Sequence, residues 1–353
     1  MTEPKMKVGT LLGYAAGYTE AVEEIVELEK AGLDAVWVPE AYTFDAVTAM
    51  GFLAARTERI EIGSGILPIY TRTPTVLGMT AAGLDALTGG RAMLGLGASG
   101  PQVIEGFHGV RYDAPVGRTR EIIEICRMLW RREKLVYDGR YYKLPLPAEE
   151  GTGLGKPLKL INHPLREHIP VVVAALGDRN VEMTAELAEY WLPIFFWPEK
   201  AESVWGDALA RGRAKRDPAL GELGVIAGSM VAIGDGTEHL RDAGRGIAAL
   251  YIGGMGARGK NFYNTLMQKY GYTEEAARIQ DLYLDGHKKE AEAAIPSEFL
   301  AATSLIGPES FVRERLAAMA EAGVTYLNVQ PMAFDTAGKV EIIAKLKELI
   351  DDL

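Results

Sequence analysis

Short apolar runs alternate with longer amphipathic segments along most of the chain. Runs of four to eight aliphatic residues are typical of buried strands, whereas apolar residues spaced three and four apart indicate helices that pack on them. The first part of the chain predicts strands at residues 6–12, 35–39 and 60–66, followed by helices at residues 20–31, 44–56 and 75–88. This unit returns about every thirty residues, as βα units do.

The same alternation continues after residue 90 and brings the number of predicted strands to eight. A helix at residues 119–131 places Ile122, Cys126 and Leu129 on one face, so Cys126 is predicted to lie in the core. The other strands are predicted at residues 92–97, 171–175, 191–196, 224–233 and 325–329, and the other helices at residues 180–189, 203–215 and 339–349.

Two stretches interrupt the alternation. Asp138-Gly139 at the centre of residues 135–144 is a hairpin signal, and the Gly- and Pro-rich residues 145–166 indicate an exposed loop. Residues 237–323, between the seventh and eighth strands, look mostly helical. We therefore expect a single domain over residues 1–353, with insertions after strands four and seven.

Eight βα units in a chain of this length predict an α/β fold of the TIM (β/α)8 barrel type, with a doubly wound sheet as the alternative. In such a barrel the functional site is built on the loops at the carboxyl ends of the strands. Residues that follow the predicted strands are therefore the first candidates for function.

The charge balance limits the possible partners. The 353 residues include 38 basic and 48 acidic side chains, a formal net charge of -10. A nucleic-acid-binding surface needs an excess of Lys and Arg, and no dense basic run occurs, so nucleic acid is not an expected partner. An anionic ligand would have to be held by local groups such as backbone amides.

The cysteine and histidine content bears on the cellular compartment of the protein and on metal binding. The single cysteine, Cys126, excludes an internal disulfide and fits a reducing compartment. The first seventeen residues lack the pattern of a signal peptide, and the apolar runs are too short for a membrane span. We expect a cytoplasmic protein without membrane association, and no metal site, because the five histidines lack metal-ligand spacing.

Residues 95–100 match the glycine fingerprint G-x-G-x-x-G after a strand. We do not expect a classical NAD(P) site here, because the motif follows the fourth strand and the next clear helix is predicted only at residue 119. Gly97, Gly100 and Gly177 either present amides to a phosphate or simply permit tight turns; turn chemistry alone favours the second interpretation.

Three further features follow strands and allow two interpretations each. Glu40 ends an apolar strand and either faces a ligand or caps the next helix. Arg72 either holds an anion or is solvated. The cluster Phe195, Phe196 and Trp197 forms either an aromatic wall over a planar ligand or part of the core, and core packing is the commoner case.

Together these segments resemble the bacterial luciferase-like superfamily, and within it the deazaflavin (coenzyme F420)-dependent oxidoreductases, the group that includes methylenetetrahydromethanopterin reductase. The resemblance covers nearly the whole chain. It rests on residues 39–41, 63–68 with 72–74, 97–102 with 105–109, 174–177 and 249–256.

The resemblance implies a set of site residues. A non-prolyl cis peptide, which here would join Gly65 and Ile66, backs the deazaflavin ring, and Glu40 matches the acidic residue near the ring and is the candidate catalytic residue. The loop Gly97, Ala98, Ser99, Gly100 and Pro101 would border the coenzyme, and the turn Ala175, Leu176, Gly177 and Asp178 would take its phosphate.

One position departs from the family. Its sugar-phosphate dehydrogenases carry a catalytic histidine directly after the acidic residue, where this chain has Ala41. The resemblance therefore implies a coenzyme F420 (8-hydroxy-5-deazaflavin)-dependent oxidoreductase that moves a hydride between the coenzyme and an unidentified small organic substrate, with a homodimer as its assembly. The alternatives are an FMN-dependent luciferase-like monooxygenase and a non-catalytic binding protein.

Overall fold

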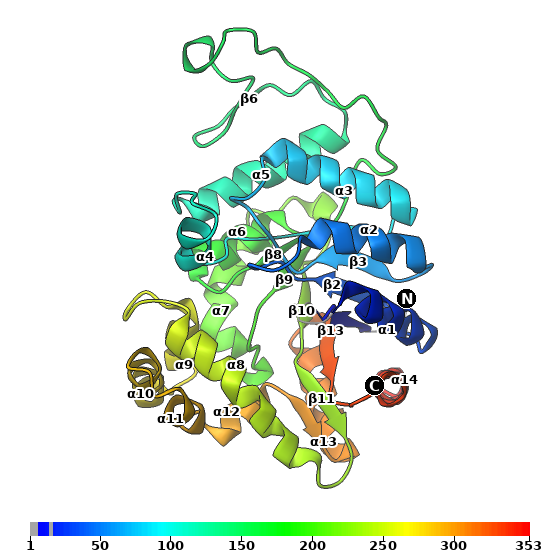
Figure 1. Cartoon of the computed structure of the whole chain (residues 1–353), viewed down its shortest axis with the longest axis vertical. Coiled ribbons are helices and arrows are strands. Elements are labelled where there is room, and N and C mark those ends of the chain that lie inside the picture. Colours follow the sequence, from blue (N-terminus) through cyan, green and yellow to red (C-terminus); the bar gives the residue numbers. More distant parts are fainter. Residues whose placement is uncertain (1–5, 14–16) are drawn as a thin grey trace.

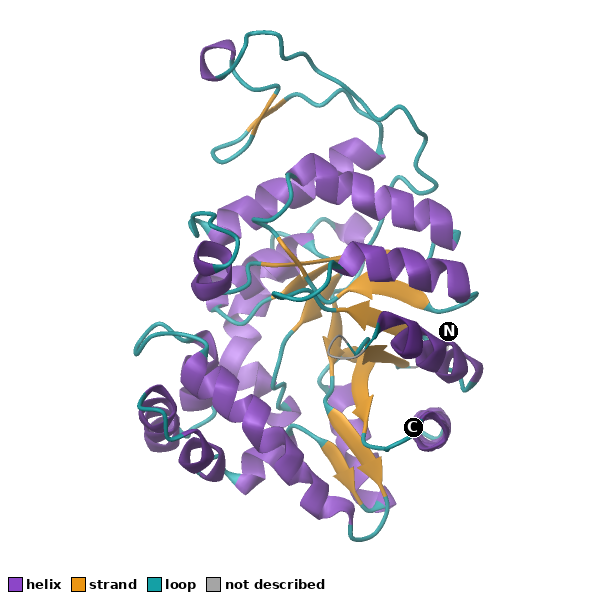
Figure 2. Cartoon of the chain, in the orientation of Figure 1, coloured by secondary structure: helices purple, strands orange, loops and turns teal. Residues whose placement is uncertain are grey.

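Eight parallel strands close into a barrel in the computed structural model, which describes residues 6–13 and 17–353 (Figures 1 and 2). Successive strands pair with each other, and β13 returns to pair with β1, where Gly9 lies opposite Asn328. In order around the barrel the strands are β1 (Lys7–Leu11), β2 (Ala35–Val38), β3 (Glu61–Ser64), β5 (Ala92–Gly97), β8 (Val171–Ala174), β9 (Tyr190–Leu192), β10 (Gly224–Ala227) and β13 (Val324–Pro331). The predicted TIM barrel is confirmed, and the doubly wound alternative is wrong.

Helices surround the barrel and cover its outward-facing apolar residues. Val8, Val36 and Ile62 belong to this outer core and are buried completely. Cys126 is also buried there, as predicted. The covering helices are α1 (Tyr18–Lys30), α2 (Ala46–Arg56), α3 (Pro74–Thr88), α5 (Pro115–Trp130), α6 (Asp178–Leu187), α7 (Pro198–Arg213), α13 (Glu309–Glu321) and α14 (Thr336–Asp351). No helix in the described ranges is both long and apolar enough to span a membrane.

Trp37 fills the barrel interior, and glycines on the neighbouring strands make room for it. A Cβ atom on Gly63 would lie 2.3 Å from Cζ3 of the indole, and one on Gly9 would lie 2.9 Å from its Nε1. The interior is therefore a packed core below the mouth, as in other barrels of this type.

The predicted strand at residues 224–233 is two strands. The chain breaks at Gly228, which has φ +154 and where a Cβ atom would lie 2.3 Å from the carbonyl oxygen of Asn328. Beyond the break, β11 (Met230–Ile233) leaves the barrel and pairs with the far end of β13 and with β12 (Leu305–Gly307). The prediction missed β12, a three-residue strand inside a segment with helical periodicity.

Two other predicted boundaries were wrong. The strand expected at residues 191–196 ends at Leu192, and Phe195 adopts a left-handed backbone with φ +53. A short helix, α4 (Pro101–Gly106), directly follows the glycine fingerprint, so the next helix does not wait until residue 119. The motif nevertheless sits on a closed barrel, where a Rossmann site has no place.

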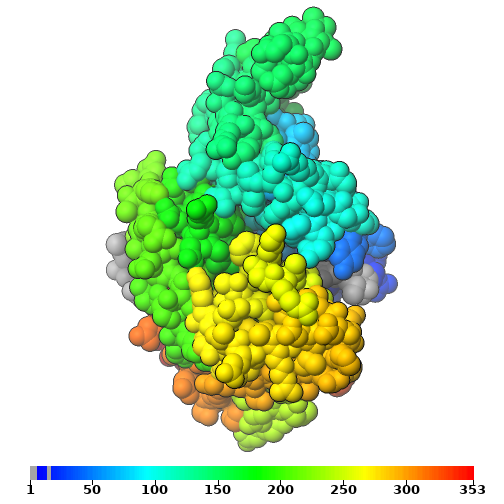
Figure 3. Space-filling view, turned by 90° about the vertical axis from the view of Figure 1, so that its left-hand side faces the viewer, coloured from blue at the N-terminus to red at the C-terminus, as the bar shows by residue number. Residues whose placement is uncertain are grey.

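The excursion after α5 projects from the body of the molecule (Figures 1 and 3). It contains the predicted hairpin, β6 (Tyr137–Asp138) and β7 (Lys143–Leu144), then η1 (Ala148–Glu150) and a long loop. The insertion between β11 and β12 is mostly helical, as expected, and consists of η3 (Thr237–Gly244), α8 (Arg245–Ala249), η4 (Leu250–Gly254), α9 (Phe262–Lys269), α10 (Thr273–Leu284), α11 (Lys288–Ala293) and α12 (Ser297–Ala302). The remaining short elements are β4 (Leu67–Pro68) and η2 (Pro218–Leu220).

Candidate active site

The carboxyl ends of the strands surround a mouth lined by small residues. Gly97 and Ala174 end β5 and β8 there, Gly65 and Gly228 directly follow β3 and β10, and Leu11 at the end of β1 is 45% exposed. Deeper in the barrel, Met93 and Val172 are buried. Figure 3 faces this end of the molecule, where segments near residues 100 (cyan) and 260 (yellow) border the mouth.

A cis peptide bond joins Gly65 and Ile66 between β3 and β4, at the position that the family resemblance implies. Ser64 supports this bulge: its hydroxyl donates to the carbonyl of Gly95 and accepts from the amide of Gly95, each at 2.8 Å. The side chain thus replaces the strand pairing that the bulge interrupts.

The first two glycines of the fingerprint are required by this bulge. A Cβ atom on Gly95 would lie 1.7 Å from the carbonyl oxygen of Ser64, and one on Gly97 would lie 2.6 Å from Cγ1 of Ile66. Close packing of β5 against β3 and Ile66 therefore explains why both positions are glycine. The third glycine, Gly100, precedes α4, and Ser99 before it has φ +57.

Glu40 lies at the mouth in an ion pair with Arg72. The guanidinium donates to both carboxylate oxygens, at 2.6 and 2.8 Å, and the amide of Ala46 donates to Oε2 at 2.9 Å. Arg72 also reaches Asp45 at 2.5 Å, and Asp45 caps α2 by accepting from the amide of Thr48. The hydrogen bonds that Arg72 donates to Glu40 raise the pKa of its guanidinium. Arg72 is thus neither solvated nor free for an external anion, and Glu40 does bond to the start of α2.

The turn between β8 and α6 is held by two tryptophans. Trp191 Nε1 donates to the carbonyl of Ala175 and Trp205 Nε1 to that of Leu176, both at 2.9 Å. These carbonyls therefore point to the indoles. The first amides of α6, at Asp178 and Arg179, have no carbonyl partner within the helix, as at any helix start. Such a helix start is suited to an anion. The Asp178 carboxylate lies 2.7 Å from Lys269 Nζ on α9.

The aromatic residues near the mouth form two groups, one buried in the core and one partly exposed. Phe196 and Trp197 are buried and pack with Trp205 and Tyr270, so core packing describes them. Tyr70 packs on Tyr112 with ring centroids 5.1 Å apart, and burial raises the pKa of both phenols. They therefore remain protonated at neutral pH.

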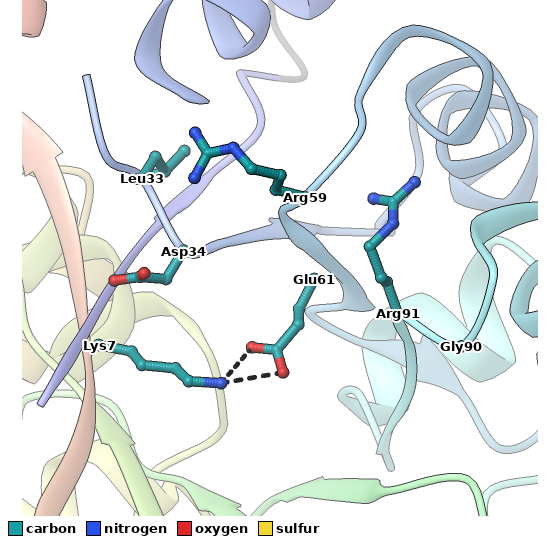
Figure 4. A pocket seen from close by; sticks show the side chains of 7 residues that line it. All are labelled: Lys7, Leu33, Asp34, Arg59, Glu61, Gly90 and Arg91. Atoms are coloured by element: carbon teal, nitrogen blue, oxygen red, sulfur yellow. Dashed lines mark hydrogen bonds and ion pairs between the residues drawn. The ribbon is translucent and has the colours of Figure 1, made fainter. Parts of the chain in front are cut away.

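A hollow lies at the opposite, amino-terminal end of the barrel (Figure 4). Lys7 Nζ is 3.0 Å from both oxygens of Glu61, and Tyr326 donates to Glu61 at 2.6 Å. Charged groups that satisfy one another at this end typically stabilise a barrel, so we place the candidate site at the mouth. The hollow is lined by Lys7, Leu33, Asp34, Arg59, Glu61, Gly90 and Arg91.

The structure brings the sequence-predicted residues together, because β2, β3, β5 and β8 are consecutive in the barrel. Glu40, Gly65 with Ile66, residues 97–101 and residues 175–178 follow these four strands. Sequence reasoning did not assign a role to Ser64, Trp191 or Trp205. Ser64 bonds to the backbone of Gly95, and the two tryptophans donate to the carbonyls of the turn before α6. In the described ranges no group of three metal-ligating side chains occurs.

Known proteins share this architecture over nearly its whole length. The family model described as luciferase-like monooxygenase matches residues 5–326. A provisionally named coenzyme F420-dependent oxidoreductase of Mycobacterium tuberculosis is 39% identical over 99% of this chain and 100% of its own. The coenzyme F420-dependent tetrahydromethanopterin reductase of Methanopyrus kandleri superposes with a TM-score of 0.79 at 20% identity, over 97% of this chain and 98% of that one.

A solved structure with FMN bound also has the fold. The oxygenating constituent of 3,6-diketocamphane monooxygenase from Pseudomonas putida superposes with a TM-score of 0.64 at 18% identity, over 98% of both chains. The likeness to both solved structures concerns the fold, whereas the family model and the mycobacterial relative identify the sequence family. The chain belongs to the luciferase-like monooxygenase family and is an enzyme of its coenzyme F420-dependent oxidoreductase group.

Proposed function

We propose that the protein transfers a hydride between coenzyme F420 and a small organic substrate at the barrel mouth. The observation that carries this proposal is the 39% identity, over essentially the full length of both chains, to a relative named for that coenzyme. The coenzyme supplies the hydride chemistry, and the protein orients the reactants and excludes water.

The residues at the mouth fit such a coenzyme. A flat ring would lie over the Gly65–Ile66 bulge, beside Ala174 and bordered by residues 97–101. The Ala175–Asp178 turn presents helix-start amides, which hold a phosphate without a net positive charge. Backbone amides at this turn would allow a chain of net charge -10 to bind an anionic coenzyme.

We propose that Glu40 is the catalytic carboxylate and that it lies beside the coenzyme. Arg72 and the amide of Ala46 donate to its oxygens and hold the carboxylate in a fixed position.

Fluorescence titration distinguishes this proposal from its alternative, an FMN-dependent monooxygenase. We expect saturable binding of coenzyme F420 and much weaker binding of FMN to the purified chain. Tight FMN binding without coenzyme F420 binding would instead favour the monooxygenase, for which the FMN-bound neighbour is the specific observation.

We also propose that the enzyme works in the cytoplasm as a homodimer and acts on a small molecule rather than on nucleic acid. The single, fully buried cysteine supports a reducing compartment. The acidic charge balance supports the absence of a nucleic-acid partner.

A further inference from the structure

Most of the exposed aromatic side chains in the described ranges lie in segments that follow barrel strands. Among the described residues the exposed aromatic side chains are Tyr42, Phe44, Phe107, Phe262 and Phe334. The first two follow β2, Phe107 follows β5 and its helix α4, Phe262 opens α9 and Phe334 follows β13. Exposed aliphatic side chains, by contrast, concentrate on α3 and on the excursion after α5.

Three of these aromatics border the candidate site directly. Tyr42, 70% exposed, and Phe107, 66% exposed, have ring centroids 6.2 Å apart and bridge the loops after β2 and β5. Phe262, 63% exposed, has its Cε1 atom 3.3 Å from where a Cβ atom of Gly177 would lie. We call Tyr42, Phe107 and Phe262 the aromatic rim.

The cations Arg72 and Lys269 beside the aromatic rim are paired, and Lys260, two residues before Phe262, is a single exposed ammonium group. Arg72 is neutralised by Glu40 and Asp45, and Lys269 by Asp178. Arg179 lines a separate hollow between α5 and α6 together with Glu182 and Glu186. The approach to the mouth therefore offers apolar rings rather than a cation cluster for a substrate phosphate or carboxylate.

We propose that the organic substrate is an uncharged, predominantly apolar molecule whose hydrocarbon part lies on the aromatic rim. This inference rests on the proposed function and specifies its substrate class. Exposed apolar patches on soluble proteins mark binding surfaces, and aromatic rings supply much contact area with few rotatable bonds. Tyr42 and Phe107 follow β2 and β5, and Phe262 lies beside Gly177, so a molecule with its reactive end at the mouth would extend across the rim.

Calorimetric titration with a homologous series of alkan-2-ones, from butanone to decan-2-one, tests the proposal on the chain with and without saturating coenzyme F420. We expect affinity to rise about threefold to fourfold per methylene group, with a negative heat-capacity change. Phe107→Ser and Phe262→Ser should reduce the gain in affinity per methylene group. Leu154→Ser, at an exposed site on the excursion, is the control and should leave this gain unchanged.

Three results would overturn the proposal: affinity independent of chain length, equal losses in the control variant, or tighter binding of glucose 6-phosphate than of the longest ketone. A change of sedimentation coefficient in Phe107→Ser would also overturn it, because the rim would then be an interface between copies. Failure of the proposed function is recognised separately, since it abolishes coenzyme F420 binding and leaves the ketone series measurable.

Discussion

Glu40 and Arg72 lock the loop after β2 to the loop after β4 through a bidentate ion pair at the rim of the barrel. Both side chains are largely buried, with 9% and 16% exposure, so the pair is shielded from bulk solvent. It fixes the relative position of two loops that border the proposed coenzyme site.

A double-mutant cycle of Glu40→Gln and Arg72→Gln measures this coupling. We expect each single substitution to lower the free energy of unfolding by about 1–3 kcal/mol, because it leaves a charged or polar partner incompletely bonded. The coupling energy between the sites should be about 1–3 kcal/mol. Urea unfolding provides the measurement, and strictly additive effects would contradict a direct pair.

The same variants report on catalysis. Glu40→Gln should retain coenzyme F420 binding within a fewfold, since Ala46 still donates to the side-chain oxygen, whereas hydride transfer should fall by about 100-fold or more. Loss of coenzyme affinity without any effect on turnover would assign Glu40 a purely positioning role.

Gly97→Ala tests whether the glycine fingerprint serves the bulge. The new Cβ atom would lie 2.6 Å from Cγ1 of Ile66 and push that side chain toward the mouth. We expect a loss of about 1–3 kcal/mol in stability and a roughly tenfold weaker coenzyme F420 affinity. Gly106→Ala is the control, because a Cβ atom there meets nothing within 4 Å. Equal effects of both substitutions would argue against the steric explanation.

Cys126 should be chemically inert in the native protein. Burial raises the pKa of its thiol to about 12 from a usual value of 9.0, so the reactive thiolate is scarce at neutral pH. Because the folded-state pKa is the higher one, this group favours the folded state below pH 9 and its contribution is lost as the pH rises from about 9 toward 12. Alkylation by iodoacetamide at pH 8 should require urea. Rapid alkylation without denaturant would contradict the buried position.

The sequence predicted the barrel because its strands are regular apolar runs separated by full helices. The prediction failed where a contact between distant residues decides the local structure. The strand predicted at residues 224–233 is interrupted at Gly228, where the carbonyl of Asn328 in β13 leaves no room for a side chain. Short elements such as α4 and β12 carry too few residues to show a period. Gly97 and Gly177 were found as motif positions, but Trp205 was not, because it reaches Leu176 from 29 positions away.

Trp205→Phe tests whether the indole prepares the α6 helix start for an anion. The substitution keeps most of the ring packing but leaves the carbonyl of Leu176 without the donor that lies 2.9 Å from it. We expect a loss of about 1–3 kcal/mol in the free energy of unfolding and weaker coenzyme F420 binding, because the freed turn can rotate its carbonyl toward the phosphate. Trp130→Phe is a matched control: its Nε1 donates to the carbonyl of Gly78 at the same 2.9 Å, between α5 and α3. It should cost similar stability and leave coenzyme affinity unchanged in a fluorescence titration. If both variants weakened the coenzyme equally, the effect would be one of general stability, and Trp205 would have no specific part in holding the phosphate turn.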